Sequence, residues 1–555
     1  MLLPPTAAIQ RTVEIDGTAL SADVDSQLES VTVVDRLAMP DTFTLVFRDP
    51  AHEILGLAGL AIGKGVKVST TSVNSDTPAL LIDAEVTSIE ADYDALGARA
   101  VVRGYDRSHR LAAGRKTATF QNVKYSEVAQ QIAGGAALQA DVDDSGAVVD
   151  HVLQANVSDL EFLYTLARRI GFDCRVEGTT LLFKRPVESS GAPAGGDLTS
   201  TDPVALVWNL NLSEFRARMT AVAQVKEVKV RGWDVTAKEA VIGRADVSAS
   251  GVQVSMTPAD LASAVGGETM TVVDHPVGTQ EAADELATAR AAQIGSAAFE
   301  ATAIALGSPA LKAGTAVSVS GIDPALEGKW VVTGSRHEFG ASAYRTHLEF
   351  AGRQDRSISG LVSQGGSARD RYYGVAVAIV TDNNDPDKLA RVKLKYPWLG
   401  DDVESSWARL TAAGAGNQYG VVFIPQVGDE VLVAFEHGDI SHPIVVGGLW
   451  NGQDAIPFDY GSDLDAGSVT YCGIVSRTGH KLSFFESGSE SKIQLLTKGG
   501  AVTLTFDEQN REAKLETTGK VIIDAQGDVE IKAGGSMKLE ASGSMTIKGA
   551  TVAIN

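Results

Sequence analysis

The sequence GDVEIKAGGSMKLEASGSMTIKG, residues 527–549, repeats a pattern that is eight residues long. One series of glycines recurs at this spacing from just before the stretch, at Gly519, Gly527, Gly535 and Gly543. Apolar and polar side chains alternate between the glycines, as they do in β-strands that bury one face. A glycine at a fixed period indicates a tight bend where another backbone comes close. We therefore predict a series of short strands joined by glycine bends.

The odd-numbered residues of this tail are predicted to face inward. The large apolar ones are Val521, Ile523, Val529, Ile531, Met537, Leu539, Met545 and Ile547. The even-numbered positions hold many Lys, Asp and Glu residues, with Ile522 as the apolar exception. A lone narrow ribbon cannot bury its apolar face, and three chains are the smallest number that encloses an interior. Residues 511–555 are therefore expected to form a needle, an intertwined β-helix or prism of three identical chains.

Two other structures would show the same alternation. An amyloid-like segment is disfavoured by the outward charges and the regular glycines. A single-chain β-solenoid is disfavoured because its coils usually contain about twenty residues or more. The multi-chain needle is therefore the preferred interpretation.

The last five residues, TVAIN, shift the pattern by one position, so that Val552 and Ile554 become the apolar residues. A repeat that ends with such a shift is interpreted as a finished, blunt tip. Three copies of this end would form a small apolar platform with unpaired strand ends, which is a poor surface to expose to water. We therefore predict that Val552, Ile554 and Asn555 contact a separate tip protein.

The composition excludes several functions. The chain has 555 residues, so several domains are expected. Its formal charge of −22 argues against nucleic-acid binding, which needs clustered Lys and Arg. Cys174 and Cys472 lie far apart and fit neither a disulfide framework nor a zinc site.

The start of the chain, MLLPPTAAIQRTVEIDG, has neither the basic nor the apolar segment of a secretory signal. No run of residues approaches the roughly twenty apolar residues of a membrane helix. Assembly in the cytoplasm without a signal peptide is expected, so a protein that acts outside the cell would leave by another route.

Residues 371–452 are predicted to form a small all-β barrel in the manner of an OB-fold. Short apolar runs alternate there with turn clusters; the runs are residues 375–380, 391–396, 407–410, 420–423, 430–435 and 443–449. Such barrels often bind oligonucleotides or sugars. The acidic balance of the chain and the few aromatic residues expected at the surface weaken that function here.

The same region carries a family resemblance. The stretches GVAVAIVTDNNDPDKLARVKLKYPWL, SSWARLTAAGAGNQYGVVFIPQVGDEVLVAFEHGDISHPIVVGGLWNG and RTGHKLSFFE resemble the VgrG family. The family comprises the central spike proteins of type VI secretion, contractile phage tails and extracellular contractile injection systems. The motifs stand in order and precede the eight-residue repeats, which the family also carries, so the resemblance covers residues 371–555.

The resemblance implies a mainly β protein with two hub β-barrels, an α/β insertion between them, an OB-fold barrel and a trimeric needle. The boundaries expected here are a first hub barrel at 1–110, an α/β insertion and linker at 111–200, and a second hub barrel at 201–365. They continue with the OB barrel at 366–460, a β neck at 461–510 and the needle at 511–555.

The resemblance also implies a function and partners. The protein would be the structural spike and hub of a contractile injection machine, whose needle punctures a target envelope. Its six hub barrels per trimer would adapt a six-fold tube to a three-fold tip. The implied partners are two further copies of the chain, inner tube and baseplate proteins, a PAAR-like tip protein, effector cargo, and the target membrane in transient contact. The particle would be extracellular on release or firing.

The hub duplication has independent support in the residues. LGLAGLAIGKGVKVS, residues 55–69, parallels LGSPALKAGTAVSVS, residues 306–320, with Gly63 matching Gly314 at one shared offset. Similar strand pairs follow both segments. Between them, residues 124–135 and 158–171 are predicted to be amphipathic helices. Ser158 and Asp159 are the N-cap candidates of the second helix, and Gly171 is the residue expected to end it.

No catalytic, cofactor-binding or metal site is predicted. GxSxG, HExxH and Walker A motifs are missing from the sequence. His437, Asp439 and His442 are interpreted as a polar turn between strands, and His337 lacks a second histidine nearby. No enzyme domain fits between Asn451 and the repeats, and none is expected after Asn555.

Two alternative functions remain. Asp401, Asp402 and Glu404 could supply the carboxylates of a cell-wall hydrolase that acts from a barrel surface, but clustering in one turn favours solvated loop charges. The second alternative is a receptor-binding tail fibre, which shares trimeric needles but lacks the paired hub barrels.

Overall fold

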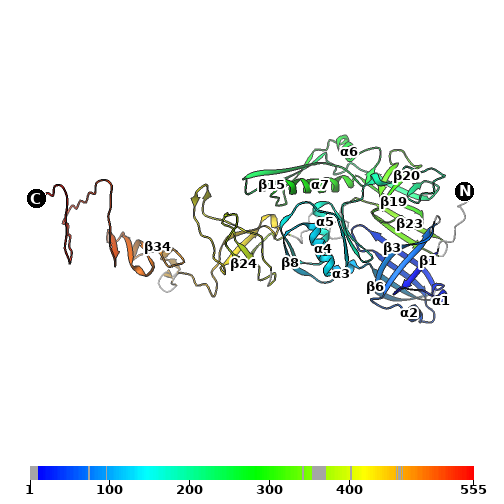
Figure 1. Cartoon of the computed structure of the whole chain (residues 1–555), viewed down its shortest axis with the longest axis horizontal. Helices are drawn as coiled ribbons and strands as arrows, with labels where there is room; N and C mark the ends of the chain where they lie inside the picture. The colour runs from blue at the N-terminus through cyan, green and yellow to red at the C-terminus, as the bar shows by residue number, and fades with distance from the viewer. Residues whose placement is uncertain are drawn as a thin grey trace. The chain divides into compact units, whose positions relative to one another are not determined.

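The computed structural model describes residues 10–72, 75–95, 97–340, 343–352, 371–400, 403–457, 459, 464–465 and 467–554. The chain forms two compact units, Met1–Leu449 and Trp450–Asn555. The first contains the hub strands, two α/β layers and a small barrel (Figure 1). The second contains a β-meander and the repeat tail. The mainly β fold expected from the sequence is confirmed.

The first unit is built on a sheet of 11 strands, in the order β14-β19-β23-β22-β3-β4-β7-β6-β5-β1-β2. The strands are β1 (Arg11–Ile15), β2 (Thr18–Ala19), β3 (Leu28–Arg36), β4 (Thr42–Arg48), β5 (Gly65–Ser72), β6 (Ser75–Asp94), β7 (Gly97–Tyr105), β14 (Leu212–Met219), β19 (Phe299–Leu306), β22 (Gly334–Phe339) and β23 (Tyr344–Phe350). Short helices α1 (Ala22–Asp25) and α2 (Ile54–Leu57) lie in its connections. The sheet contains strands from both predicted hub barrels.

The two hub halves are joined by one strand pair. β22 runs antiparallel to β3, with Gly334 opposite Arg36 and Phe339 opposite Val31. Phe339 and Tyr344 from the second half are buried in the same core as Val31, Val33 and the apolar residues of the first half. The second half adds a sheet in the order β13-β20-β21-β17, made of β13 (Ala205–Val207), β17 (Val252–Gln253), β20 (Ala316–Ser320) and β21 (Gly328–Val331). The sequence comparison of the two halves did not predict that they share a sheet.

The two similar segments of the hub adopt the same local structure. Gly63 and Gly314 have φ angles of 84° and 83°, which are left-handed values that favour glycine. The Gly63 N–H donates to the Val86 carbonyl and the Gly314 N–H donates to the Val332 carbonyl, both at 2.8 Å. This agreement supports the duplication inferred from residues 55–69 and 306–320.

The α/β insertion contains three helices among its described residues, of which α4 and α5 are the longer ones and pack on short strands. Its elements are α3 (Ser108–Ala112), β8 (Lys116–Val123), α4 (Tyr125–Gly135), β9 (Gln139–Val142), β10 (Val149–Val157), α5 (Asp159–Ile170), β11 (Asp173–Glu177), β12 (Thr180–Lys184) and a 3-10 turn, η1 (Ser189–Gly191). The Ser158 side chain accepts from the Glu161 N–H and Gly171 ends α5 at φ 73°, so Ser158 is confirmed as the N-cap and Gly171 as the end of the helix. The other N-cap candidate, Asp159, is the first residue of the helix. The apolar faces of α4 and α5 meet in one core.

A second α/β layer lies within the predicted second hub barrel. It consists of β15 (Glu227–Asp234), β16 (Glu239–Asp246), β18 (Thr269–Val272), α6 (Pro258–Ala264) and α7 (Gln280–Ser296). Figure 1 shows α7 lying along β15. A Cβ at Gly243 would come within 2.2 Å of the Ala283 carbonyl group, so glycine permits α7 to approach β16. The sequence did not predict this layer.

Residues 375–448 form the predicted OB barrel. Its sheet has the order β25-β24-β29-β30-β26, with β24 (Val375–Asp382), β25 (Lys393–Lys395), β26 (Arg409–Leu410), β29 (Glu430–Phe435) and β30 (Pro443–Gly448). Bridges from Val392 to Ala408 and from Lys395 to Glu404 close it. The barrel also carries β27 (Ala415–Gly416), β28 (Tyr419–Gly420) and a 3-10 turn, η2 (Glu436–Gly438).

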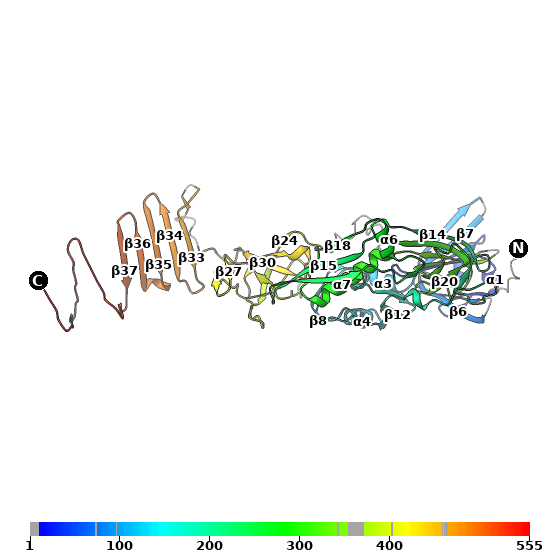
Figure 2. The same cartoon turned by 90° about the horizontal axis from the view of Figure 1, so that it is seen from above.

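The second unit contains an antiparallel meander of five strands, which Figure 2 shows side by side. They are β33 (Tyr471–Val475), β34 (Lys481–Ser487), β35 (Glu490–Leu496), β36 (Val502–Asp507) and β37 (Glu512–Thr517). A short pair, β31 (Leu464–Asp465) and β32 (Ser468–Val469), precedes them, and the 3-10 turn η3 (Lys498–Gly500) separates β35 from β36. After β37 the chain runs without strand pairing to residue 554.

Candidate functional site

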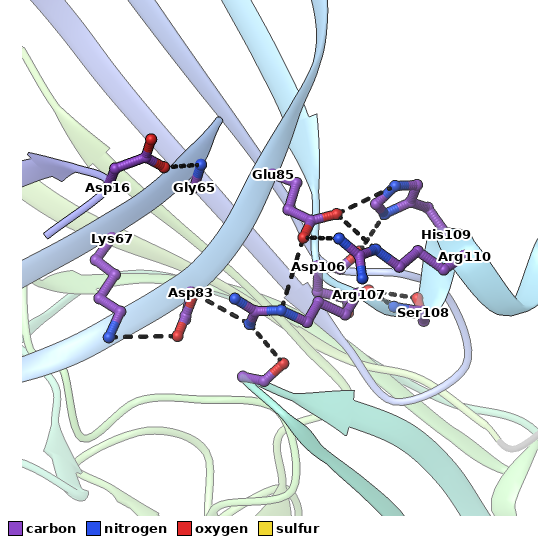
Figure 3. A network of polar contacts seen from close by, with 11 residues as sticks. Asp16, Gly65, Lys67, Asp83, Glu85, Asp106, Arg107, Ser108, His109 and Arg110 are labelled. Carbon is purple, nitrogen blue, oxygen red and sulfur yellow. Dashed lines mark hydrogen bonds and ion pairs between the residues drawn. The ribbon is translucent and has the colours of Figure 1, made fainter. Parts of the chain in front are cut away.

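A buried glutamate organises one junction of the hub (Figure 3). Glu85 on β6 is buried and accepts two hydrogen bonds from the Arg110 guanidinium, at 2.9 and 2.5 Å. His109 Nε2 lies 3.6 Å and Arg107 Nε lies 3.7 Å from the same carboxylate. Because charge-assisted bidentate pairs are strong and directional, this carboxylate fixes helix α3 on the barrel.

Arg107 also extends this junction to the α/β insertion. Its guanidinium lies 3.1 Å from the Asp83 carboxylate and donates at 2.9 Å to the Gly178 carbonyl, in the turn between β11 and β12. On the other side of the insertion, Arg175 donates at 2.8 Å to the Ala313 carbonyl of the second hub half. The insertion is thus bonded to both hub halves.

Three aspartates lie where the hub halves meet, of which Asp35 and Asp106 are buried and Asp41 is half-buried. Asp35 accepts from the Ala313 N–H at 2.9 Å, and Asp106 accepts from the Asp41 N–H at 2.9 Å. Burial raises the pKa of all three carboxyls, and for Asp41 the nearby Asp35 and Asp106 charges raise it further. These groups hold hydrogen bonds between segments, so we assign them a structural role.

The OB barrel contacts the α/β insertion through apolar and polar side chains. Leu153 on β10 is part of the OB core. His151 Nε2 bonds the Glu404 carbonyl at 3.0 Å, and the Arg169 guanidinium lies 3.6 Å from the Asp439 carboxylate. The insertion therefore connects the hub to the OB barrel.

The loop after β24 is held by a single carboxylate. Asp385 accepts from the backbone N–H groups of Asp387, Leu389 and Arg391, and from the Arg391 guanidinium at 3.1 and 2.7 Å. Hydrogen bonds from Arg391 hold the pKa of Asp385 far below its ordinary value. Lys388 and Ala390 in this loop have positive φ angles, which the Asp385 hydrogen bonds hold in place.

The residues considered for hydrolysis do not form a catalytic pair in the described structure. Asp401 and Asp402 lie outside the described residues. Glu404 accepts from Thr381 at 2.7 Å and pairs with Lys393 at 2.9 Å. Partial burial alone would raise the pKa of Glu404, but these two partners outweigh it and hold the pKa below its ordinary value. A general acid of a glycosidase needs a raised pKa instead.

The histidines singled out in the sequence have other partners. His442 Nδ1 lies 3.3 Å from Asp439, in a turn that also faces Arg169. His337 is buried and bonds Tyr344 at 2.8 Å and Ser335 at 3.2 Å, and burial lowers its pKa to about 3. Among the described residues, no three His, Cys, Asp or Glu side chains gather as a metal site.

A shallow hollow of about 300 Å³ lies on the polar face of the 11-stranded sheet. Its charged residues are arranged in pairs, such as Arg36 with Glu349 at 3.5 Å and Arg216 with Glu214 at 3.0 Å. A surface whose charges compensate one another in this way offers no convergent acid and base for hydrolysis. Across the part of the chain that the structure describes, no helix has the length and apolar character needed to cross a membrane.

The predicted needle residues are all exposed in the single chain. The chain bends at residues 518–519, 526–527, 534–535 and 542–543, which include the four predicted bend glycines. The exposed fraction of the eight predicted interior residues ranges from 50% for Val521 to 75% for Ile523. Val552 and Ile554 are exposed as well, and Asn555 lies outside the described residues.

A further exposed apolar surface lies on the OB barrel. Tyr419, Val422 and Phe423 are 73%, 76% and 64% exposed, and Tyr373 is 73% exposed. The expectation that few aromatic residues are exposed on this barrel is therefore wrong. The signal in the sequence was the absence of any charged residue from 411 to 428, in a chain of which 21% is charged.

A family model supports the OB assignment. Residues 376–450 match the type VI secretion system/phage-baseplate injector OB domain. A second model, described as the Alg8 N-terminal domain, matches residues 87–340, a range within the hub. The fold and the OB match define the class of this chain, a mainly β spike-type protein with an injector OB domain.

Within that class the chain is VgrG-like. It is 38% identical over 99 residues to the type VI secretion system spike protein VgrG5 of Pseudomonas aeruginosa, which is 16% of this chain and 12% of the relative. It is 37% identical over 76 residues to the actin cross-linking toxin VgrG1 of Vibrio cholerae, which is 13% of this chain and 7% of the relative. The matches thus span a small part of the relatives' length.

One solved structure extends the likeness to most of the fold. A chain of the half-lidded Francisella PdpA–VgrG complex superposes with a TM-score of 0.52 at 8% identity. The superposition covers 92% of this chain and 88% of that one. At this identity the likeness concerns the fold alone, and it includes regions outside the matched OB domain.

Proposed function

We propose that this protein is the structural spike and hub of a contractile injection machine, with a three-chain needle at its C-terminal end. The observation that carries the proposal is the repeat tail. Its apolar residues alternate at odd positions, are at least half exposed in one chain, and are separated by bends at eight-residue intervals. Such a face is stable in water only when other chains cover it.

The proposed action is mechanical. A needle concentrates the force of contraction on a small tip, and interwound strands resist bending because backbone groups pair between chains. The hub must pass this force to the needle. The contacts of Arg107, Arg175 and Arg169 link the hub halves, the insertion and the OB barrel, as expected of a block that transmits force.

Removal of residues 511–555 is expected to weaken trimer formation and resistance to heat. The deletion takes away the apolar residues that we assign to the interchain interior. Multi-angle light scattering of the full-length and shortened proteins at micromolar concentration measures the effect. A full-length protein that is monomeric under these conditions would contradict the proposed trimer.

The relatives' names and the family resemblance support the proposal that this chain binds other proteins of such a machine. We propose that the hub adapts inner tube and baseplate proteins to the three-fold needle, and that assembly precedes release or firing of the particle. Effector cargo and transient contact with a target membrane are further parts of this proposal.

The blunt end of the needle is proposed to bind a PAAR-like tip protein. Ile554 is 87% exposed in the single chain and lies in the segment where the alternation shifts. Ile554→Asp is expected to abolish recovery of candidate tip proteins in a pull-down while leaving the trimer intact, because this residue lies beyond the last regular repeat. Equal recovery by the original and variant spikes would remove this part of the proposal.

We further propose that the chain has no cell-wall hydrolase activity of its own. The paired Glu404 carboxylate, with its lowered pKa, supports this view. Purified protein is expected to leave peptidoglycan intact in a dye-release assay. Reproducible cleavage that disappears on replacement of Asp401 or Glu404 would overturn this expectation. The match to an injector OB domain also favours a spike over a receptor-binding fibre.

A further inference from the structure

The OB arm, which we define as residues 411–428, is an exposed apolar segment of the OB barrel. It leaves the barrel after β26 and returns before β29, and Figure 2 shows its strand β27 on the side of the barrel away from the hub strands. Its apolar side chains are open to solvent: Tyr419, Val421, Val422, Phe423, Ile424 and Val427. An exposed patch of this kind marks an interaction site.

The backbone of the arm is also open. β27 and β28 form a two-strand tip, after which residues 421–426 belong to no strand. Within the described part of the chain, the N–H groups of Val422, Phe423 and Ile424 make no hydrogen bond. The barrel sheet closes through the bridge from Val392 to Ala408, which lie next to its two end strands. Asn383 and Asp429 bond the arm backbone at Pro425 and Gln426, so the open part of its backbone is residues 422–424.

A matching apolar surface lies on the outside of the same barrel. The outer OB face, which we define as Val375, Val377, Leu432, Ala434 and Ile444, is one face of β24, β29 and β30, since these residues stand opposite one another in register. The alternate residues of these strands fill the barrel core. Strands that are apolar on both faces are typical of sheets covered on both sides. In one chain Val375 remains 57% exposed.

A second copy of this chain fits both surfaces better than a foreign protein does. The arm and the outer OB face are present on every copy, and Val422 of the arm and Val375 of the face stay more than half exposed in one chain. A closed ring requires such a pair of different patches, because each copy uses one patch on each neighbour. Each chain carries a formal charge of −22, so copies repel one another except where the surface is uncharged. The arm has no charged residue.

We propose that the OB arm of one copy packs on the outer OB face of the next copy, head to tail around the three-fold axis. This inference rests on the proposed trimer and adds an interchain contact that is independent of the needle. Charged residues are depleted at the centres of protein interfaces and aromatic residues are enriched, which agrees with Tyr419 and Phe423 in the arm.

The test uses full-length protein with Cys472→Ser, which removes an exposed thiol. The remaining Cys174 is buried, and burial raises the pKa of its thiol to about 12, so it stays unreactive. Val422→Cys in the arm and Val377→Cys on the outer OB face are combined, and a short bismaleimide is added. The double variant is expected to give a covalent trimer on a denaturing gel. Each single variant can join at most two chains.

A matched control moves the arm cysteine to another exposed position of the same barrel. Because Asn383 bonds the Pro425 carbonyl of the arm, the control cysteine is placed beyond it at the exposed Asp387, whose polar contacts lie in its own loop. Asp387→Cys paired with Val377→Cys is expected to lose the covalent trimer. Native mass spectrometry without cross-linker reports the assembly separately. A native trimer whose arm–face pair gives no covalent trimer would overturn the arm contact and leave the proposed function standing. A native monomer would overturn both.

Strong dimer formation by Val422→Cys alone would place the arms against one another and would also overturn the head-to-tail contact. Capture of a tube, tip or cargo protein by the arm cysteine, in place of a second copy, would do the same. A covalent trimer that requires both cysteines supports the proposal.

Discussion

Gly535→Val is expected to lower the melting temperature of the assembled protein far more than Lys538→Val. In a needle with odd positions inward, three valine side chains enter the crowded axis at one level. Overpacking costs about 1–3 kcal/mol per site, and a trimer has three such sites. Lys538 is predicted to face outward, so its replacement leaves the axis unchanged.

The single-chain structure separates packing between chains from strain within one chain. A Cβ at Gly535 would meet no atom within 4 Å, and its φ lies outside the left-handed range, so one chain by itself tolerates a side chain there. A loss of stability would therefore report packing between chains. Thermal unfolding followed by circular dichroism measures it, and equal melting temperatures for the two variants would contradict the inward assignment of the odd positions.

Asp385→Ala is expected to destabilise the OB barrel by about 3–5 kcal/mol, because removal of one partner from a buried ion pair leaves Arg391 with only the exposed Asp387 carboxylate. The Asp385 side chain is 3% exposed, and the Arg391 side chain is 17% exposed. The substitution also removes the acceptor of three backbone N–H groups in the loop. Hydrogen exchange measured by mass spectrometry in peptides from 375–435 would locate the loss.

Asp387→Ala is the matched control. Asp387 contacts the same Arg391, but its side chain is 66% exposed. Exposed ion pairs contribute about 0–1 kcal/mol, so this variant should exchange like the original protein. Equal protection of the barrel in both variants would show that Asp385 does not hold the loop.

The contribution of Asp385 to the stability of this loop depends on pH, because the pKa of Asp385 is lowered in the folded protein. A carboxyl with a folded-state pKa below its unfolded value contributes stability that is present above the unfolded pKa. That contribution is lost as the pH falls toward the folded value. The difference between the original protein and Asp385→Ala should therefore shrink in strong acid.

Local patterns were enough to predict several elements. The Ser158 and Gly171 caps of α5 are confirmed, since capping depends on residues within one turn of the helix end. The OB barrel is confirmed, because short apolar runs separated by turn residues are a local signal. The sequence match between Gly63 and Gly314 is also local. In the structure the two glycines have the same backbone angle and equivalent hydrogen bonds.

Other features depend on contacts between distant segments. The layer of β15, β16, β18 and α7 was not predicted, because many of the residues of α7 that contact the strands are alanines and small residues give a weak apolar pattern. The exposed OB arm was assigned to a barrel strand, since GVVFIP has the composition of a buried strand. Periodicity reports which residues are apolar, but not whether a neighbour covers them.

The sequence by itself determined the period of the tail, the alternation of its faces and the order of the β-rich segments. Each of these features can be recognised from residues that are close together in the sequence. Only the tertiary structure decided that β3 and β22 join the hub halves into one sheet and that Glu85, Asp35 and Asp385 are buried acceptors. It also decided which apolar surfaces of the OB barrel stay open in one chain. The partners of strand edges and of buried carboxylates come from segments that are distant in the sequence. The free energy of these contacts depends on how deeply the groups are buried, which no local pattern specifies.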